Sequence, residues 1–369
     1  MIYIHVPFCK SRCLYCDFFS STELDLRGAY VDALCREMDN RNDEILHARA
    51  QTLYIGGGTP SQLGIDNLRR IFRHLAETVR LENGAEVTLE VNPDDVTPEF
   101  AGALHDTPVN RVSMGVQTLD DGLLRLLGRR HAAAQAMKAV GLLREAGFCN
   151  LSLDLMYGLP GQTMDMWKKD VDTLLSLGIP HLSAYSLQWE EGTRLYRLLE
   201  KGEVQEADEK LSLSMYRYLM DATRNAGMHH YEISNFALYG YEARHNSGYW
   251  RDDAYVGLGP GAHSYDGKRL RSWNVSSLKE YIMPDYHHDS PDRRELLTDT
   301  DLYNERVMKR LRTDQGLSLA ELSEDEHVHA LKMAASHING GRMVLLDDCL
   351  RLTSVGIFTS NDIMSDLML

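Results

Sequence analysis

The chain has 369 residues, of which 43% are hydrophobic and 25% charged, so it is long enough for a large domain beside a small one and has the composition of an ordinary globular protein. Its formal charge of −15, without a concentrated basic patch, disfavours phosphate backbones and anionic lipid as partners, and we expect no nucleic acid ligand. There is no run of about 18 apolar residues and no signal-peptide pattern at the start, so we expect a cytoplasmic protein.

Short β-rich runs, each followed by a turn and a helical pattern, recur along most of the chain. We expect strands near residues 2–6, 51–55, 86–91, 110–115, 151–156 and 182–187, and a seventh near 229–234. Apolar residues at helical spacing predict covering helices at 65–80, where they are Ile71, Phe72, Leu75 and Val79, and at 132–146. The alternation predicts an α/β fold, a partial (β/α)6 barrel of the TIM type, with functional groups at the carboxyl ends of the strands.

The pattern changes after residue 275. Pro284 and the polar stretch 287–292 precede a helical run at 299–312, a second near 318–339, and two short strands within 343–352 around an Asp-Asp turn. We therefore expect two domains, a core at 1–275 and a small helical, winged-helix-like module at 276–369. Because the chain is acidic, we expect the module to act as a scaffold or to contact a protein partner.

Three of the six cysteines, Cys9, Cys13 and Cys16, follow the first predicted strand with the spacing C-x3-C-x2-C. Thiolates at this density are ligands for zinc or for an iron–sulfur cluster. A structural zinc site takes four ligands, and no fourth cysteine lies nearby. Three thiolates would leave one iron of a [4Fe–4S] cluster open to a cofactor or substrate, and the motif predicts such a cluster.

Polar or Gly-rich sequence also marks the ends of the next four predicted strands. Gly56-Gly57-Gly58-Thr59 follows the second, Glu90 lies in the third, Gln117 follows the fourth, and Asp154 lies within the fifth. Glycines let backbone amides approach a ligand, and a carboxylate in an apolar strand is costly unless it is paired or functional. Each feature alone is equally typical of a tight turn or a structural carboxylate. Together with the cysteine loop, they predict a ligand site at the strand ends.

The C-x3-C-x2-C motif resembles the signature of the radical S-adenosylmethionine (SAM) superfamily. Leu127-Gly128-Arg129-Arg130-His131 resembles the L-G-R-x-H of the family that contains the HemW heme chaperones and the oxygen-independent coproporphyrinogen III oxidases, and the motifs occur in the family's order. The resemblance implies SAM on the open iron and its reductive cleavage to a 5′-deoxyadenosyl radical. It leaves the catalytic residues unknown and implies SAM contacts from Tyr3, Tyr15, Gly57, Gly58, Thr59, Glu90, Gln117, Arg129 and Asp154.

Two readings of the family resemblance, chaperone and oxidase, differ at particular positions. Oxidases of this family typically have a further cysteine two residues after the third, where this chain has Phe18, and an extension before the first strand. His245-Asn246-Ser247-Gly248-Tyr249-Trp250 resembles the H-N-x-x-Y-W motif associated with heme binding in HemW. An imidazole is a natural axial ligand of heme iron, and Tyr249 and Trp250 offer flat apolar surface, although a lone histidine is equally typical of a structural hydrogen bond. The stretch 257–264 resembles both branches.

These features favour a heme chaperone that carries a [4Fe–4S] cluster, SAM and heme, and we expect no coproporphyrinogen oxidase activity. The chaperone reading implies heme held near His245 and passed to acceptor hemoproteins, membrane-associated respiratory enzymes among them, with a homodimer as one arrangement. The alternatives are an oxygen-independent coproporphyrinogen III oxidase, which decarboxylates propionates, and a radical enzyme that acts on another small molecule.

Overall fold

The main sheet closes partway into a barrel. The computed structural model describes residues 1–47, 50–286 and 293–369, so the polar stretch 287–292 lies outside the described residues. Within these ranges, nine strands form the sheet in the order β7-β8-β6-β5-β4-β3-β2-β1-β9, and β1 to β6 are parallel neighbours. The seven predicted strands are confirmed. The strands are β1 (Ile2–Val6), β2 (Ala50–Gly57), β3 (Leu81–Val91), β4 (Arg111–Gln117), β5 (Leu151–Tyr157), β6 (His181–Ser186), β7 (His229–Glu232), β8 (Asn235–Ala237) and β9 (Val256–Leu258).

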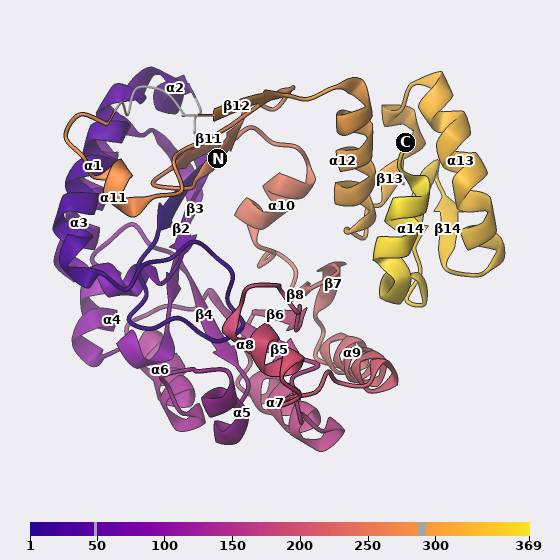
Figure 1. Ribbon diagram of the computed structural model, residues 1–369, viewed down its shortest axis with the longest axis horizontal. Helices are drawn as coiled ribbons and strands as arrows, with labels where there is room; N and C mark the ends of the chain where they lie inside the picture. Colours follow the sequence, from indigo (N-terminus) through magenta and orange to yellow (C-terminus); the bar gives the residue numbers. More distant parts are fainter. Residues whose placement is uncertain (48–49, 287–292) are drawn as a thin grey trace.

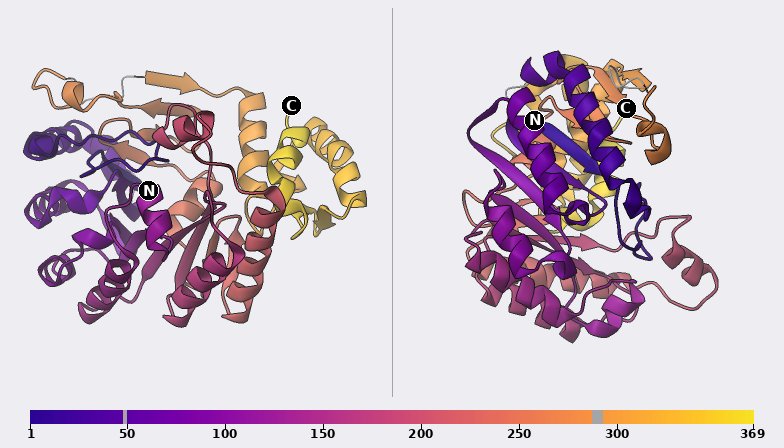
Figure 2. Two further views of the ribbon diagram at one scale, coloured as in Figure 1. Left: turned by 60° about the horizontal axis from the view of Figure 1, so that its bottom comes forward. Right: turned by 90° about the vertical axis from the view of Figure 1, so that its left-hand side faces the viewer.

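Helices alternate with the parallel strands and cover the outer face of the sheet (Figure 2). This alternation confirms the predicted partial (β/α)6 arrangement, and the helices predicted at 65–80 and 132–146 are α3 and α6. The helices that follow β1 to β6 are α1 (Arg27–Asn40), α2 (Asn42–His47), α3 (Ile65–Thr78), α4 (Pro98–His105), α5 (Asp121–Leu126), α6 (Ala133–Glu145), α7 (Met164–Ser176), α8 (Arg194–Glu200) and α9 (Glu209–Asn225).

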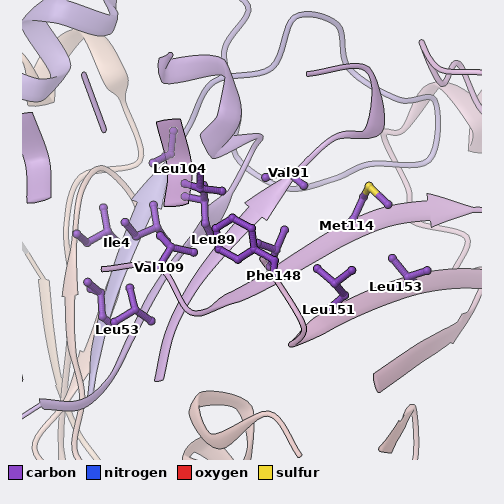
Figure 3. Close-up of a cluster of buried hydrophobic side chains, with 14 of the residues drawn as sticks. Ile4, Leu53, Leu89, Val91, Leu104, Val109, Met114, Phe148, Leu151 and Leu153 are labelled. Atoms are coloured by element: carbon purple, nitrogen blue, oxygen red, sulfur yellow. The ribbon is translucent and has the colours of Figure 1, made fainter. Parts of the chain in front are cut away.

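The main hydrophobic core lies between the outer face of the sheet and these helices (Figure 3). Alternate strand residues such as Ile4, Leu53, Leu89, Met114 and Leu153 point into it and are at most 1% exposed. Burying each side chain of this size contributes about 1.5–3 kcal/mol to folding. Since side chains alternate along a strand, the residues between them face the concave side of the sheet.

The concave face is polar, unlike the packed interior of a complete barrel. Hydrogen bonds join several of its side chains, including Ser152 Oγ with His181 Nδ1 at 2.8 Å. A polar lumen of this kind is suited to holding polar ligands or a polar plug. The strand residues that face it are Tyr3, His5, Thr52, Tyr54, Glu86, Thr88, Glu90, Arg111, Ser113, Ser152, Asp154, His181 and Ser183.

A buried carboxylate stabilises the chain where β9 pairs with β1. Glu37 of α1 is 1% exposed and accepts four hydrogen bonds of 2.6 to 2.9 Å. Its donors are the side chains of Arg41, Asn274 and Tyr281 and the backbone amide of Gly259. A Cβ on Gly259 would lie 2.5 Å from the carbonyl oxygen of His5, so only glycine fits there. The start of the stretch 257–264 therefore belongs to the edge strand of the sheet, β9, which pairs with β1.

Residues beyond 275 stay joined to the first unit as far as β12. A second sheet contains β10 (His263–Tyr265), β11 (Leu270–Trp273) and β12 (Arg293–Leu296), and α11 (Leu278–Tyr281) packs into the main core. The second hydrophobic core begins at Tyr303. We therefore propose a division near residue 298 in place of the expected one at 275.

The last unit has the element order of a winged helix. It contains α12 (Asp299–Leu311), β13 (Leu317–Ser318), α13 (Glu324–Asn339), β14 (Met343–Leu346), β15 (Cys349–Leu352) and α14 (Ser360–Leu367). The predicted strand pair is confirmed, with Asp347 at φ 49° and Asp348 at φ 57° in its turn. The helix predicted from 318 starts later, because Ser323 caps it and residues 317–318 form a strand. Among the described residues, no helix is long and apolar enough to cross a membrane.

Candidate functional site

The three clustered cysteines lie on the loop after β1, beside the Gly-rich loop after β2. Cys9 Sγ lies 3.6 Å from Thr59 Oγ1, and Cys13 Sγ accepts a hydrogen bond from Arg129 Nη1 at 3.5 Å. Burial is the main cause that raises the pKa of the Cys9 thiol and raises that of Cys16 to about 11. Thiolates in this loop therefore need a compensating positive group such as a metal.

The donor set fits a [4Fe–4S] cluster better than a single metal ion. In the part of the chain that the structure describes, no three His, Cys, Asp or Glu side chains are arranged to hold one ion. A cluster instead accepts one thiolate on each of three irons. Beside Cys13, the Nε of Arg129 is buried without a partner, and buried donors are rarely left unused. The residues present thus suit a cluster with an anionic group next to Arg129.

Glu90 fixes the Gly-rich loop from the neighbouring strand. One carboxylate oxygen of Glu90 accepts from the backbone amide of Gly57 at 3.1 Å, and the other accepts from the Tyr54 hydroxyl at 2.5 Å. A Cβ on Gly58 would lie 2.7 Å from the carbonyl oxygen of Phe8. The glycines therefore allow this loop to pack against the start of the cysteine loop.

Gln117, Arg129 and Asp154 continue the site along β4 and β5. Gln117 adopts φ 68° at the point where the β4–β5 pairing shifts register, and its amide folds back over Gly115. Arg129 Nη2 donates to the carbonyl oxygen of Gly115 at 2.6 Å and to the Asn92 side chain. The guanidinium is therefore anchored on the sheet with one edge toward Cys13.

The two carboxylates of the site are harder to ionise than usual. Burial is the main cause that raises the pKa of Glu90 to about 7 and that of Asp154 to about 6, and the negative charge of Asp154 adds to the rise at Glu90. A ligand with a positive charge beside them would reverse both shifts. The chemistry at this point of the lumen favours cationic or hydroxyl-bearing ligand groups.

Two tyrosines, Tyr3 and Tyr15, are also among the residues implied as SAM contacts. The Tyr3 hydroxyl lies 3.2 Å from His5 Nδ1, and Tyr15 of the cysteine loop lies beside Arg129, where burial raises its pKa. The structure joins Thr59 and Arg129 directly to the cysteines and Gly57 to Glu90, whereas Tyr3 lies three residues before the end of β1, beside Tyr54.

The residues implied for heme lie on a different element, α10 (Arg244–Trp250), which lies on the concave side of the sheet (Figure 1). Glu86 holds the start of α10 by accepting from the amides of Arg244 and His245, each at 3.0 Å. His245 is 2% exposed, and both of its ring nitrogens are engaged, Nδ1 with Thr52 Oγ1 at 2.8 Å and Nε2 with the Tyr249 hydroxyl at 3.0 Å. In this arrangement the imidazole has no nitrogen free for iron.

Replacing His245 with Gln is expected to alter how stability depends on pH. Burial, and then the nearby amino terminus, lower the pKa of His245 to about 3, so the folded chain keeps the ring neutral, whereas an unfolded histidine has a pKa of about 6.5. Acid therefore favours unfolding of the wild type below about pH 6.5, because the histidine takes up a proton on unfolding. Glutamine does not titrate, so the variant has no such loss of stability. The stability advantage of the wild type over the variant should shrink by about 1 kcal/mol between about pH 7.5 and 5.5 in urea titrations. An equal difference in unfolding free energy at both pH values would contradict the conclusion that His245 is buried and neutral in the folded chain.

Several residues that organise the site were missed from the sequence. Thr52, Tyr54 and Glu86 link α10 to the strands, and in the sequence they stand between apolar strand residues. Their alternation with apolar neighbours was the available signal, since it predicts a polar second face of the sheet. Glu37 has the same signal, an acidic residue among the core positions of a helix.

Comparison with known proteins places these features in a family. Residues 3–174 match the Radical SAM superfamily. The chain is 42% identical over 284 residues to the heme chaperone HemW of Lactococcus lactis subsp. lactis (strain IL1403), covering 76% of this chain and 73% of that protein. It is 35% identical over 353 residues to HemW of Mycobacterium tuberculosis (strain ATCC 25618 / H37Rv), covering 93% and 90%. The solved structure of coproporphyrinogen III oxidase (HemN) from Escherichia coli, a radical SAM enzyme, matches with a TM-score of 0.85 and 22% identity over 100% of this chain and 89% of that one, which shows the shared fold.

Proposed function

Because the chain belongs to the HemW family of radical SAM proteins, we propose that it is a heme chaperone, which binds heme and transfers it to acceptor hemoproteins. The observation that carries the proposal is its 42% identity to a heme chaperone over 76% of its length. Phe18, which is 65% exposed, stands where oxidases of the wider family typically have a fourth cysteine, and this supports the chaperone over the oxidase.

As a radical SAM protein, the chain carries a [4Fe–4S] cluster and SAM. We propose that Cys9, Cys13 and Cys16 hold the cluster. When it is bound, the cluster supplies the electron for the reductive chemistry of the superfamily. Arg129 suits the carboxylate of SAM, because a guanidinium pairs with carboxylates through two N–H groups, and Glu90 and Asp154 suit its ammonium or ribose hydroxyls. The proposed SAM residues are Tyr3, Tyr15, Gly57, Gly58, Thr59, Glu90, Gln117, Arg129 and Asp154.

His245 is the proposed axial ligand of heme, with Tyr249 and Trp250 against the porphyrin. Since His245 is 2% exposed and both of its ring nitrogens are engaged, ligation requires α10 to leave its position in the lumen. Trp250 lies at the end of α10 and is partly exposed, with Arg312 stacked on its ring at 4.9 Å, so displacement of Arg312 would offer its ring to the porphyrin. Release of α10 would then bring the imidazole to the iron.

The acceptors are proposed to be hemoproteins in contact with the cytoplasm, membrane-associated respiratory enzymes among them. A formal charge of −15 supports protein partners over nucleic acid. We also propose a homodimer as the transferring form, because two chains could present two heme sites to one acceptor.

Heme titration tests the proposed function. Anaerobically purified protein with reconstituted cluster is titrated with heme without SAM, and the Soret band is followed in the wild type, His245→Ala and His263→Ala. His263 is an exposed histidine outside the motif and serves as the matched control. We expect saturation at one heme per chain in the wild type and in His263→Ala, and binding weakened about tenfold or more in His245→Ala.

Equal and unsaturable binding by all three proteins would contradict the heme site. Turnover of coproporphyrinogen with SAM in the same preparation would then support the oxidase. Saturable binding without such turnover supports the chaperone.

A further inference from the structure

α10 lies directly against the residues that orient Glu90. The ring of His245 packs on the ring of Tyr54 with centroids 5.2 Å apart and planes at 30°. Tyr54 in turn donates its hydroxyl hydrogen to Glu90, and the other oxygen of Glu90 holds the amide of Gly57. A continuous line of contacts therefore runs from the heme motif through Tyr54 to the Gly-rich loop.

The position of His245 in this line is fixed from three sides. Thr52 holds Nδ1, the Tyr249 hydroxyl holds Nε2, and Glu86 holds the backbone amide. The ring of Tyr3, one of the proposed SAM contacts, lies 6.4 Å from the ring of His245 and 6.1 Å from that of Tyr54. The imidazole of His245 thus lies beside the rings of both Tyr54 and Tyr3.

His245 is 2% exposed, so a porphyrin cannot reach its Nε2 while α10 stays in this position. Freeing Nε2 breaks the bond to Tyr249, and moving α10 into reach of a porphyrin removes the ring from Tyr54. Movement of α10 must also break the contacts that α12 makes with α10 and with the residues that follow α10. They include the 2.7 Å ion pair of Lys309 with Asp252 and the hydrogen bond from Arg310 to the carbonyl oxygen of Trp250. Arg312, directly after α12, also stacks on Trp250 at 4.9 Å. Tyr54 would lose the surface that holds its hydroxyl toward Glu90.

We propose that His245 is a positioning residue of the SAM site, acting through Tyr54 on Glu90, so that SAM binding and heme ligation in one chain oppose each other. The proposal rests on the function proposed above. SAM favours the state in which α10 packs in the lumen against Tyr54, and heme favours the state in which α10 has left the lumen. Each ligand therefore shifts the equilibrium between these states against the other. Linkage requires the two ligands to weaken each other by the same factor.

The first test measures SAM affinity without heme, by equilibrium dialysis on cluster-loaded protein. His245→Ala should bind SAM about fivefold or more weakly than the wild type, and His245→Gln, whose flat amide can pack on Tyr54 and reach Thr52, should recover part of the loss. His263→Ala, which lies outside the line of contacts, should bind as the wild type does. Wild-type SAM affinity in His245→Ala would overturn the positioning role, whatever the outcome of heme titration.

The second test measures the dissociation constant of heme with and without saturating SAM. We expect SAM to weaken heme binding about fivefold or more in the wild type, and the factor to approach one in Tyr54→Phe, which keeps the ring and loses the bond to Glu90. Tyr239→Phe is the control, because Tyr239 is 78% exposed and lies outside the line of contacts. Saturable heme binding that SAM leaves unchanged would overturn the opposition and leave the chaperone function standing. Unsaturable heme binding would overturn the opposition together with the heme site itself.

Discussion

Replacing Cys13 with Ser is expected to abolish the cluster. Serine keeps an oxygen that can accept the hydrogen bond from Arg129, so the fold of the loop should survive, but it removes one of the three proposed thiolate ligands. Iron and sulfide contents after anaerobic reconstitution should fall from about four of each per chain to near zero. SAM binding should weaken about tenfold or more in the same protein, because the superfamily binds SAM on the open iron.

Cys149→Ser is the matched control for the loss of the cluster. Cys149 is exposed, and the backbone carbonyl of Gly147 is the acceptor of its thiol. This variant should load iron and sulfide as the wild type does. A Cys13→Ser protein that still assembled a full cluster would show that Cys13 is not a ligand, whereas loss in both variants would point to a reconstitution fault.

The order and kind of most elements could be predicted because the hydrophobic pattern changes period where the structure does. Strand β5 has apolar residues at Leu151, Leu153 and Leu155, and all three point into the main core. The β10–β12 sheet could not be predicted in the same way. Its strand β12 is exposed along its whole length and pairs across a long connection, so no local pattern marks it, and the expected boundary at 275 was placed before it.

The candidate site was predictable where several residues share one loop or one strand end. Cys9, Cys13 and Cys16 lie within eight residues of one loop, and the positions of Glu90 and Asp154 follow from the parallel sheet. The position of His245 was not predictable, since its partner Thr52 is far away in the sequence and the bond depends on how α10 enters the lumen. The motif identified the residue but gave no information on its burial.

Replacing Glu37 with Ala is expected to cost about 3–5 kcal/mol of stability. The substitution leaves the guanidinium of Arg41, which is 3% exposed, with only the half-exposed Glu44 as its ionic partner. It also removes the acceptor of the Gly259 amide and one of the two acceptors of the Asn274 side-chain amide. Removing one member of a buried ion pair has an effect of this size because the remaining charge stays desolvated. Urea denaturation followed by circular dichroism measures it. Glu37→Gln, which keeps an oxygen acceptor, is the substitute if the alanine protein does not fold, with an expected loss of about 1–3 kcal/mol.

Glu44→Ala separates burial from charge at the same arginine. Glu44 also pairs with Arg41, at 2.9 Å, but its side chain is 46% exposed, so its loss should cost less than about 1 kcal/mol. Equal losses for the Glu37 and Glu44 variants would mean that the charge of Arg41, and not the buried acceptor, sets the effect. A large loss of stability confined to the Glu37 variant would mean that this carboxylate stabilises the pairing of β1 with β9. The position of β1, whose Tyr3 and His5 side chains hydrogen-bond in the lumen, would then depend on a residue outside the site.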